Sequence, residues 1–416
     1  MRENILIAWR FLIAKKRAML MSLTGIVFGV AFFILTQAQT SGFEDFFIRT
    51  ILGTNGTLRV QDEFQDTVNS MIVAGEADGG KFEIPLREGR TYISGIRNPM
   101  QLIEAIKAFS GVEAAAPVLR GDVRISSGFR SENGRAIGIL PTEYIEVSDL
   151  EFQIINGDLR AFSESPEGVL VGTRLAERLG VLPGGFILIN HLGETRRYQV
   201  SGIFETGIDF FDKTHVFIHL QEARRLLGQM ERVSYIQVMT RDPDKAPALA
   251  RQMEYSLGHY VASWQEREKS WLEVFRVLRI SSALSMSTII LIAGLGMFNT
   301  LAIIVMERSR EIAILRSVGF SRYDILSIFL YQGLIVYALG TLVGFVMAAL
   351  LTKGLENLPI HIRGIFSTDH FVVLWSSWHY VWAAVVAGIV VVIAALIPAR
   401  RAARVEPGEV IRGTGG

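Results

Sequence analysis

The chain has 416 residues, of which 50% are hydrophobic and 20% are charged. Its mean hydropathy of +0.33 is high for a soluble protein, whereas the charged fraction is high for a bundle made only of membrane spans. Both values fit a chain whose apolar and polar parts are segregated. The formal net charge of +1 gives no indication of a nucleic-acid partner. The 0 cysteines exclude disulfides, thiolate metal sites and a cysteine nucleophile.

Four long stretches of the sequence contain no Asp, Glu, Lys or Arg. They are residues 18–43, 280–306, 325–352 and 370–399, the last being most apolar at about 381–397. Charges are costly near the centre of a bilayer, and a membrane helix needs roughly 20 apolar residues. We therefore predict four transmembrane helices. The first is predicted to be an uncleaved anchor, because its apolar region is too long for a typical signal peptide.

Basic residues cluster on one side of the predicted spans. They precede the first span, lie between the second and third, and follow the fourth: Arg10, Lys15, Lys16, Arg17, Arg308, Arg310, Arg316, Arg322, Arg400, Arg401, Arg404 and Arg412. The positive-inside rule then predicts that both termini and the 307–324 connection are cytoplasmic. Residues 44–271 would face outward. Residues 4–16 predict an interfacial helix or, alternatively, a simple extension of the first span.

Between residues 44 and 271 the pattern changes to short alternating runs broken by Gly, Pro, Asn and Asp. Strands are predicted at 169–171, 186–190, 198–204, 215–219 and 235–239, and helices at 98–109, 173–180, 221–227 and 243–257. Gly180 stands where glycine commonly ends a helix. Residues 264–278 are predicted to continue into the second span. The predicted fold class is an α-helical membrane protein with four transmembrane helices and an extracytoplasmic α+β domain inserted between the first and second.

Two short patterns approach known ligand sites but lack a required part. Residues 75–81 have the spacing of a phosphate-binding loop, yet Phe82 stands where a hydroxyl would hold Mg²⁺. His215 and His219 are spaced i, i+4, but on a strand they would lie far apart, with no third metal ligand evident. The HExxH and GxSxG signatures are missing. We expect no catalytic residue, metal site or bound cofactor in this chain.

Small residues recur at four-residue spacing within two predicted spans. Gly25 and Gly29 share one face of the first span, and Gly340 and Gly344 share one face of the third. Such pairs permit close contact between helices, so these glycines are predicted to lie at helix-packing positions.

The connection at 307–319 combines charged residues with an apolar stripe at Ile312, Leu315 and Val318. Gly319 would end a short helix there. Such a helix suits docking into a groove on a cytoplasmic partner, and a solvated helical turn is the alternative. The residues predicted to take part in docking are Glu307, Arg310, Glu311, Ile312, Leu315, Arg316 and Gly319.

Several motifs along the chain carry a family resemblance. They are residues 310–319, residues 397–404 with Pro407 and Arg412, residues 171–180, 202–207, 41–44 and 332–333. Together they resemble ABC permeases of the lipoprotein-releasing (LolC/LolE) and macrolide-exporter (MacB) type with an FtsX-like C-terminal module. Residues 310–319 resemble the family's coupling helix. The link at 190–195 is too short for the protruding hook of LolC-type subunits, and there the chain is similar to LolE-like or MacB-like subunits.

The resemblance implies that the chain is divided into three regions. Residues 1–43 would hold an interfacial helix and the first span, 44–271 a MacB-like periplasmic core domain, and 272–416 an FtsX-like domain with spans two to four and the coupling helix. It implies a multi-pass protein of the bacterial inner membrane. ATP and Mg²⁺ would be bound by a separate cytoplasmic ATPase, since this chain would have no ATPase site. Further implied partners are a second permease copy (homo- or heterodimer), membrane lipid, and a periplasmic carrier or adaptor.

The implied function is mechanotransmission: ATP hydrolysis by the partner drives extraction or export of a lipoprotein or lipid-like substrate. Phe28, Phe32, Phe33, Met297 and Phe298 would line a lateral opening for such a substrate, or simply pack or face lipid. Two alternatives remain, namely MacB-like tripartite efflux of peptides or drugs, and FtsX-like signalling to a cell-wall hydrolase. The mechanotransmission hypothesis predicts that Glu311→Lys or Arg316→Glu impairs coupling to the ATPase without affecting insertion into the membrane.

Overall fold

The computed structural model describes residues 2–14, 16–65, 68–73, 82–87, 91–93, 95–363 and 367–405. The chain divides into two compact units. The helical unit comprises Met1–Phe46, Glu273–Ile360 and Asp369–Gly416, and the outer domain comprises Phe47–Leu272 and His361–Thr368. The pattern at 75–81 that approaches a phosphate-binding loop lies outside the described residues.

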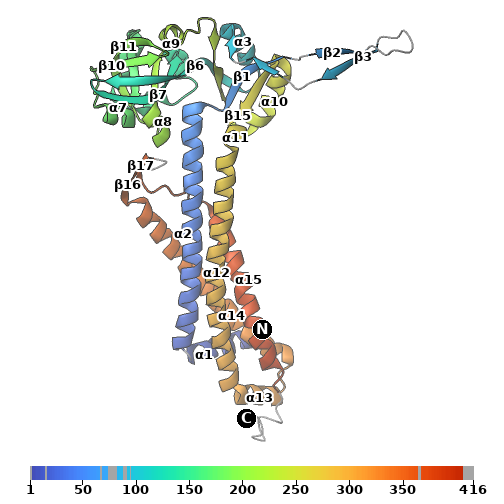
Figure 1. Cartoon of the computed structure of the whole chain (residues 1–416). Coiled ribbons are helices and arrows are strands. Elements are labelled where there is room, and N and C mark those ends of the chain that lie inside the picture. The colour runs from blue at the N-terminus through green and yellow to red at the C-terminus, as the bar shows by residue number, and fades with distance from the viewer. Residues whose placement is uncertain are drawn as a thin grey trace. The chain divides into compact units, whose positions relative to one another are not determined.

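Long apolar helices dominate the helical unit (Figure 1). Its helices are α1 (Arg2–Ala14), α2 (Lys16–Asn55), α12 (Lys269–Glu307), α13 (Ser309–Ser317), α14 (Arg322–Glu356) and α15 (Ser377–Ala403). The short strands β16 (Pro359–Arg363) and β17 (Ser367–His370) come between α14 and α15 in the chain and are divided between the two units. Within the described part of the chain, four helices are long and apolar enough to cross a membrane: α2, α12, α14 and α15. The prediction of four spans is confirmed.

Two of these helices extend well beyond their uncharged stretches. α2 continues to Asn55, and α12 already begins at Lys269. The predicted continuation of residues 264–278 into the second span is therefore correct from Lys269 onward, after the short α11 (Trp264–Arg267). α1 is a separate helix that packs on the bundle through Ala8 and Leu12, both buried.

The outer domain alternates strands with short helices. Its first half contains β1 (Leu58–Gln65), β2 (Val68–Val73), β3 (Phe82–Arg87), β4 (Thr91–Ile93), β5 (Ile96–Arg97), α3 (Pro99–Lys107), β6 (Val112–Ser127), β7 (Arg130–Ile139), α4 (Pro141–Tyr144), α5 (Leu150–Gln153), β8 (Ile154–Gly157) and α6 (Leu159–Glu164). Its second half contains β9 (Gly168–Gly172), α7 (Thr173–Leu179), β10 (Phe186–His191), β11 (Glu194–Phe204), α8 (Asp209–Thr214), β12 (His215–His219), α9 (Leu220–Leu227), β13 (Arg232–Val233), β14 (Tyr235–Thr240), η1 (Pro243–Lys245), α10 (Ala246–Leu257) and β15 (His259–Ser263). The predicted α+β class is confirmed.

The strands of the outer domain form a closed barrel joined to a second sheet. The order β10-β11-β9-β12-β7-β6 closes because β10 also pairs with β6. The strand β6 is long enough to serve both sheets: Leu119–Ser127 pairs with β7 in the barrel, whereas Val112–Val118 pairs with β14. Beyond β14 the second sheet continues through β1 to β15. Apolar side chains on β9 and β12 are almost fully buried, which explains their uninterrupted apolar runs.

Candidate coupling site

The helix α13 occupies the connection between α12 and α14 because both of its ends carry stop signals. Arg308 leaves the helical region of backbone conformation, which separates α13 from α12. After α13, Gly319 has a φ of +115°, a conformation that favours glycine. Ser321 and Asp324 then form a reciprocal capping box that starts α14. The chain thus presents one short, well-delimited helix between two spans.

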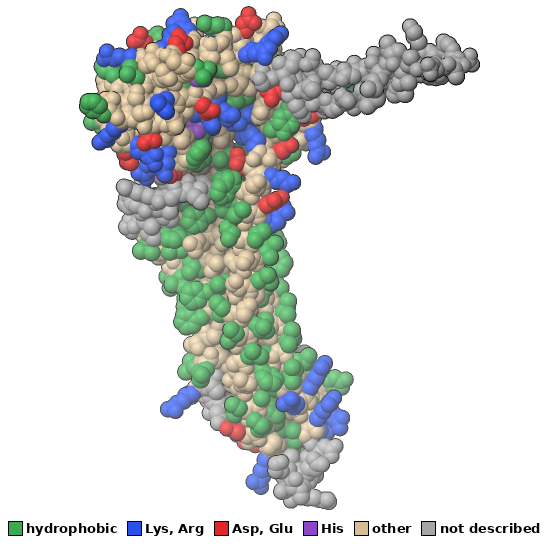
Figure 2. Space-filling model, viewed as in Figure 1, with side chains coloured by type: hydrophobic (Ala, Val, Ile, Leu, Met, Phe, Trp, Pro, Cys, Tyr) green, Lys and Arg blue, Asp and Glu red, His purple; other side chains and the backbone are tan. Residues whose placement is uncertain are grey.

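The apolar residues of α13 divide between an inner and an outer face. Ile312 and Ala313 are buried against the bundle, while Ile314 is 49% exposed. Of the predicted stripe, Ile312 therefore faces this chain itself, Leu315 is half-buried, and Val318 is 76% exposed. The outer face that remains for a partner combines Ile314 and Val318 with charged residues. Figure 2 shows basic side chains gathered at this end of the helical unit.

The outer face of α13 borders a shallow groove shared with α1, here called the coupling groove. It measures about 540 Å³ and is lined by Ile7, Arg10, Phe11, Arg308, Glu311, Ile314 and Leu315. The Arg308 guanidinium lies 5.7 Å from the centre of the Phe11 ring and forms an ion pair with Glu311. Apolar walls with two arginines and one glutamate among the lining residues suit an amphipathic partner segment.

Arg316 has a role within the chain. Its Nη1 donates hydrogen bonds to the backbone oxygens of Ala403 and Val405, at 3.2 and 3.1 Å. These oxygens lie at the C-terminal end of α15, where helix carbonyls lack partners and favour a cation. Arg316→Glu would therefore also weaken the attachment of α13 to α15. Glu311→Lys is the cleaner test of docking, because Glu311 is exposed.

The remaining residues predicted for docking lie on the surface of this end of the unit. Glu307 ends α12, and Arg310 and Glu311 stand in the first turn of α13, all three exposed. α1 is fastened nearby, because Asn4 Nδ2 donates to Asp324 Oδ1 of the capping box at 3.2 Å and to Ser327 Oγ at 3.0 Å.

The four predicted packing glycines lie where helices approach closely. A Cβ on Gly25 would come within 3.0 Å of Ala293 on α12, and one on Gly29 within 3.0 Å of Ile290. On the other side of α2, a Cβ on Gly340 would lie 2.8 Å from Ile26, and one on Gly344 would lie 3.0 Å from Val30. α2 is thus held between α12 and α14.

The structure separates the residues predicted to face a substrate into two groups. Phe28 and Phe32 are 49% and 40% exposed and stack with ring centres 6.1 Å apart. Phe33 and Met297 are buried in the bundle, and Phe298 is half-buried. Of these five residues, the pair on α2 is exposed, and Phe33 and Met297 pack inside the bundle.

The motif at 41–44 is explained by four different contacts at the end of the first span. Ser41 Oγ lies 3.2 Å from His379 Nε2, and Phe43 meets Phe371 edge to face at 6.3 Å. Glu44 forms an ion pair with Arg279 of α12. Gly42 packs against the backbone of residues 372–374, and the amide of Leu374 donates to the Ala38 oxygen at 2.9 Å.

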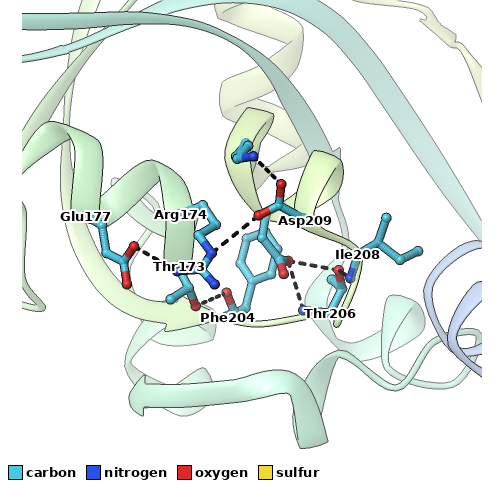
Figure 3. A network of polar contacts seen from close by, with 9 residues as sticks. Thr173, Arg174, Glu177, Phe204, Thr206, Ile208 and Asp209 are labelled. Carbon is cyan, nitrogen blue, oxygen red and sulfur yellow. Dashed lines mark hydrogen bonds and ion pairs between the residues drawn. The ribbon is translucent and has the colours of Figure 1, made fainter. Parts of the chain in front are cut away.

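In the outer domain, a polar network connects the motifs at 171–180 and 202–207 (Figure 3). Thr173 Oγ1 at the start of α7 donates to the Phe204 oxygen at 2.8 Å, at the end of β11. Arg174 lies between Glu177 at 3.0 Å and Asp209 at 3.4 Å, and Lys213 also pairs with Asp209. The network thus fixes α7 to β11 and α8 to α7.

Asp212 is the buried acid beside this network. Its Oδ1 accepts hydrogen bonds from the amide and the hydroxyl of Thr206, at 2.9 and 2.8 Å. Its Oδ2 is buried and has no hydrogen-bond partner among the described residues. Burial raises the pKa of Asp212 to about 6, more than the bonds from Thr206 lower it. The folded protein therefore binds this proton more tightly than the unfolded chain does.

This shift predicts a pH-dependent loss of stability. The unfolded carboxyl ionises near its ordinary pKa of 3.8, so the stabilising contribution is complete below pH 3.8 and is lost as the pH rises through about 6. The loss is about 3 kcal/mol. We expect the melting temperature of Asp212→Asn to rise relative to the unsubstituted protein between pH 4 and pH 7. Exposed Asp244→Asn is the control; the same rise there would contradict the assignment.

The two histidines of β12 each bind backbone groups. His215 Nδ1 lies 3.2 Å from the Phe211 oxygen, and its ring stacks on that of Phe211 at 3.7 Å. His219 Nε2 lies 2.7 Å from the Phe162 oxygen. Burial lowers the pKa of His215 to about 3, so its ring is neutral at pH 7. Among the described residues no cluster of His, Asp and Glu suitable for a metal ion is found.

Comparison with known proteins accounts for nearly the whole chain. Residues 19–255 match the family model of the MacB-like periplasmic core domain, and residues 283–407 match the FtsX-like permease C-terminal model. The lipoprotein-releasing system transmembrane protein LolC of Xylella fastidiosa (strain 9a5c) is 25% identical, with 98% of each chain covered. The macrolide export ATP-binding/permease protein MacB of Nitrosomonas europaea is 24% identical, over 98% of this chain and 58% of that protein.

Among solved structures, the periplasmic region of MacB from Actinobacillus actinomycetemcomitans covers 54% of this chain and 95% of its own, at 14% identity and a TM-score of 0.35.

Four apolar helices, an outer domain inserted after the first, and an FtsX-like C-terminal region define the class of ABC transporter permeases. This chain belongs to the LolC/MacB-type family of those permeases. Membership implies a cytoplasmic ATPase as partner.

Proposed function

We propose that this chain is the membrane subunit through which a separate cytoplasmic ATPase acts on a lipoprotein or lipid-like substrate outside the membrane. The observation that carries the proposal is the construction of α13. Its outer face presents Glu311, Ile314 and Val318, while Ile312 and Arg316 fasten its inner face to the bundle. A partner that binds the outer face would move α13 and the attached spans together.

The lengths of the helices support a mechanical role. α12 is one continuous helix of 39 residues ending beside α13, which corresponds to about 58 Å at 1.5 Å per residue. α2 is a continuous helix of 40 residues. Helices that run unbroken from a membrane span into the outer domain can transmit a displacement along their axes. ATP binding and release at the partner would then alternate two states of this lever.

The proposed assembly contains further members. The ATPase supplies the ATP and Mg²⁺ site, and a second permease copy, identical or related, supplies the other half of the transporter. The side carrying α13 and both termini is assigned to the cytoplasm of a bacterial cell with the outer domain in the periplasm, in keeping with the basic residues at that side. Docking of a cytoplasmic ATPase on α13 requires this orientation.

The relatives and one exposed aromatic pair support the proposed substrate class. A protein named for lipoprotein release matches along 98% of this chain, and the exposed pair Phe28 and Phe32 offers an aromatic surface suited to acyl chains. The complex with the cognate ATPase should be purified without nucleotide and its bound molecules identified by mass spectrometry. We expect more acylated protein to co-purify with the unsubstituted permease than with the double variant Phe28→Ala/Phe32→Ala. Enrichment of unacylated peptides or drug-like compounds instead would contradict the lipoprotein assignment.

A further inference from the structure

A pocket in the outer domain gathers four arginines around one carboxylate. The pocket measures about 390 Å³, and its charged lining residues are Arg59, Arg120, Arg135, Arg267 and Glu268. The arginines come from β1, β6, β7 and α11, so the fold brings together residues that are distant in sequence. We call this the arginine pocket. It lies outside the coupling groove and the polar network of α7 and α8.

Two of these guanidinium groups are held in place but incompletely bonded. Arg267 Nη2 donates to the backbone oxygens of Asn55 and Gly56, at 3.3 and 2.9 Å. Its Nε and Nη1 are buried and have no hydrogen-bond partner among the described residues, and the same is true of Arg59 Nε. Arg59 is fixed over the Tyr235 ring, 4.2 Å from its centre. Buried donors without partners are costly, and a bound acceptor would remove this cost.

The charge of the pocket also calls for an anion. Burial, followed by the charge of Arg59, lowers the pKa of Arg267 to about 10. The pKa of Arg120 is lowered by its partial burial, by Arg135 and by Arg59. Among the described residues, Glu268 is the single acid that lines the pocket, and burial raises its pKa, so it balances the arginines only in part. Asp122 pairs with Arg135 at 3.0 Å but is 85% exposed, and thus lies toward the solvent.

The geometry of the donors and the size of the cavity indicate the kind of anion. Guanidinium groups bind both carboxylates and phosphates through paired hydrogen bonds, but a phosphate ester offers three terminal oxygens to several guanidinium groups where a carboxylate offers two. The cavity is larger than one phosphate ion, and its other walls include Tyr144, Phe210, Phe211 and Tyr235. We propose that the arginine pocket binds the phosphate group of a phosphate ester, with the organic part of the ligand against these rings.

Such a phosphate belongs either to a lipid headgroup or to a soluble ester, and the test separates these sources. The full-length protein, purified in a neutral detergent and freed of lipid, is titrated with inorganic phosphate, with glycerol 3-phosphate and with dihexanoyl phosphatidic acid. Sodium chloride at equal ionic strength and dihexanoylglycerol are the blanks. We expect saturable thermal stabilisation by at least one phosphate compound and none by the blanks. Preference for phosphatidic acid assigns a lipid, and equal or better binding of glycerol 3-phosphate assigns a soluble ester.

Two variants locate the binding. Arg120→Gln and Arg267→Gln should each weaken it by roughly tenfold or more, because each removes charged donors. Arg120 is exposed at the rim, so its variant should fold even if Arg267→Gln loses the bonds to Asn55 and Gly56 and does not. Arg251→Gln, an exposed arginine on α10 outside the pocket, should bind as the unsubstituted protein does. Absence of saturable binding, or undiminished binding by Arg120→Gln, would overturn the proposal.

Discussion

Replacing Gly42 with alanine should strongly reduce the stability of the helical unit. A Cβ at this position would lie 2.6 Å from the Val372 oxygen, 2.7 Å from Val373 Cα and 2.9 Å from the Leu374 amide nitrogen. All three are backbone atoms, which cannot rotate away as the end of a side chain can. Overpacking of this kind costs about 1–3 kcal/mol. We expect a clearly lower melting temperature of the purified protein and a lower amount in the membrane.

The physical reason lies in how residues 371–374 attach to α2. The amide of Leu374 donates to the Ala38 oxygen, one turn before Gly42, so the segment is held against this face of the helix. Alanine must push it away and lengthen that bond. Gly296→Ala in α12 is the matched control, because a Cβ there meets no atom within 4 Å. Its melting temperature should change little, and a similar fall in both variants would refute the packing explanation.

Local patterns in the sequence predict those parts of the fold that local physics determines. The four spans follow from uninterrupted apolar stretches, and α7 follows from its apolar spacing and from Gly180, whose φ is +68°. The buried strand β12 was predictable because Val216, Phe217 and Ile218 form an apolar run between polar ends. These elements are recognisable without knowing what packs against them.

The longest strand, β6, was not predicted, because its features depend on its partners. Its first half contains Ala114, Ala115 and Ala116 followed by Pro117, all with low preference for strands. Small side chains at these positions allow close packing on β6 where the strand passes from the second sheet into the barrel. The alternation of apolar and polar residues around Val123 and Ile125, followed by a turn, is the sequence pattern that could have predicted the hairpin with β7.

The candidate sites were predictable only in part, for the same reason. The sequence located α13, but its apolar residues lie all around the helix, and only contact with the bundle decides that Ile312 is buried and Ile314 exposed. The arginine pocket carried no sequence signal, since Arg59 and Arg267 meet only after β1 and β15 pair. A motif can be recognised along the chain, whereas a pocket assembled from distant segments requires the fold.

Replacing Ile314 with glutamate should abolish productive contact with the ATPase while leaving the chain folded. Ile314 is 49% exposed and lines the coupling groove, so a carboxylate there remains solvated in the free protein. In the docked state it would be buried in an apolar contact without a partner, at a cost of several kcal/mol. We expect ATPase retention on the purified permease, and permease-dependent ATP hydrolysis, to fall by about tenfold or more.

The control must make the same chemical change away from the groove. Ile155 on β8 is 57% exposed in the outer domain, so Ile155→Glu adds the same charge at a similar exposure. Ile155→Glu should still bind the ATPase and support permease-dependent ATP hydrolysis. Both variants should have melting temperatures close to that of the unsubstituted protein. Glu311→Lys, which breaks the ion pair with Arg308 at the rim, should have a smaller effect than Ile314→Glu because both groups are partly solvated. If Ile314→Glu bound the ATPase as tightly as the unsubstituted protein does, α13 would not be the docking helix, because burying an uncompensated charge at an apolar contact must lower the affinity for the ATPase.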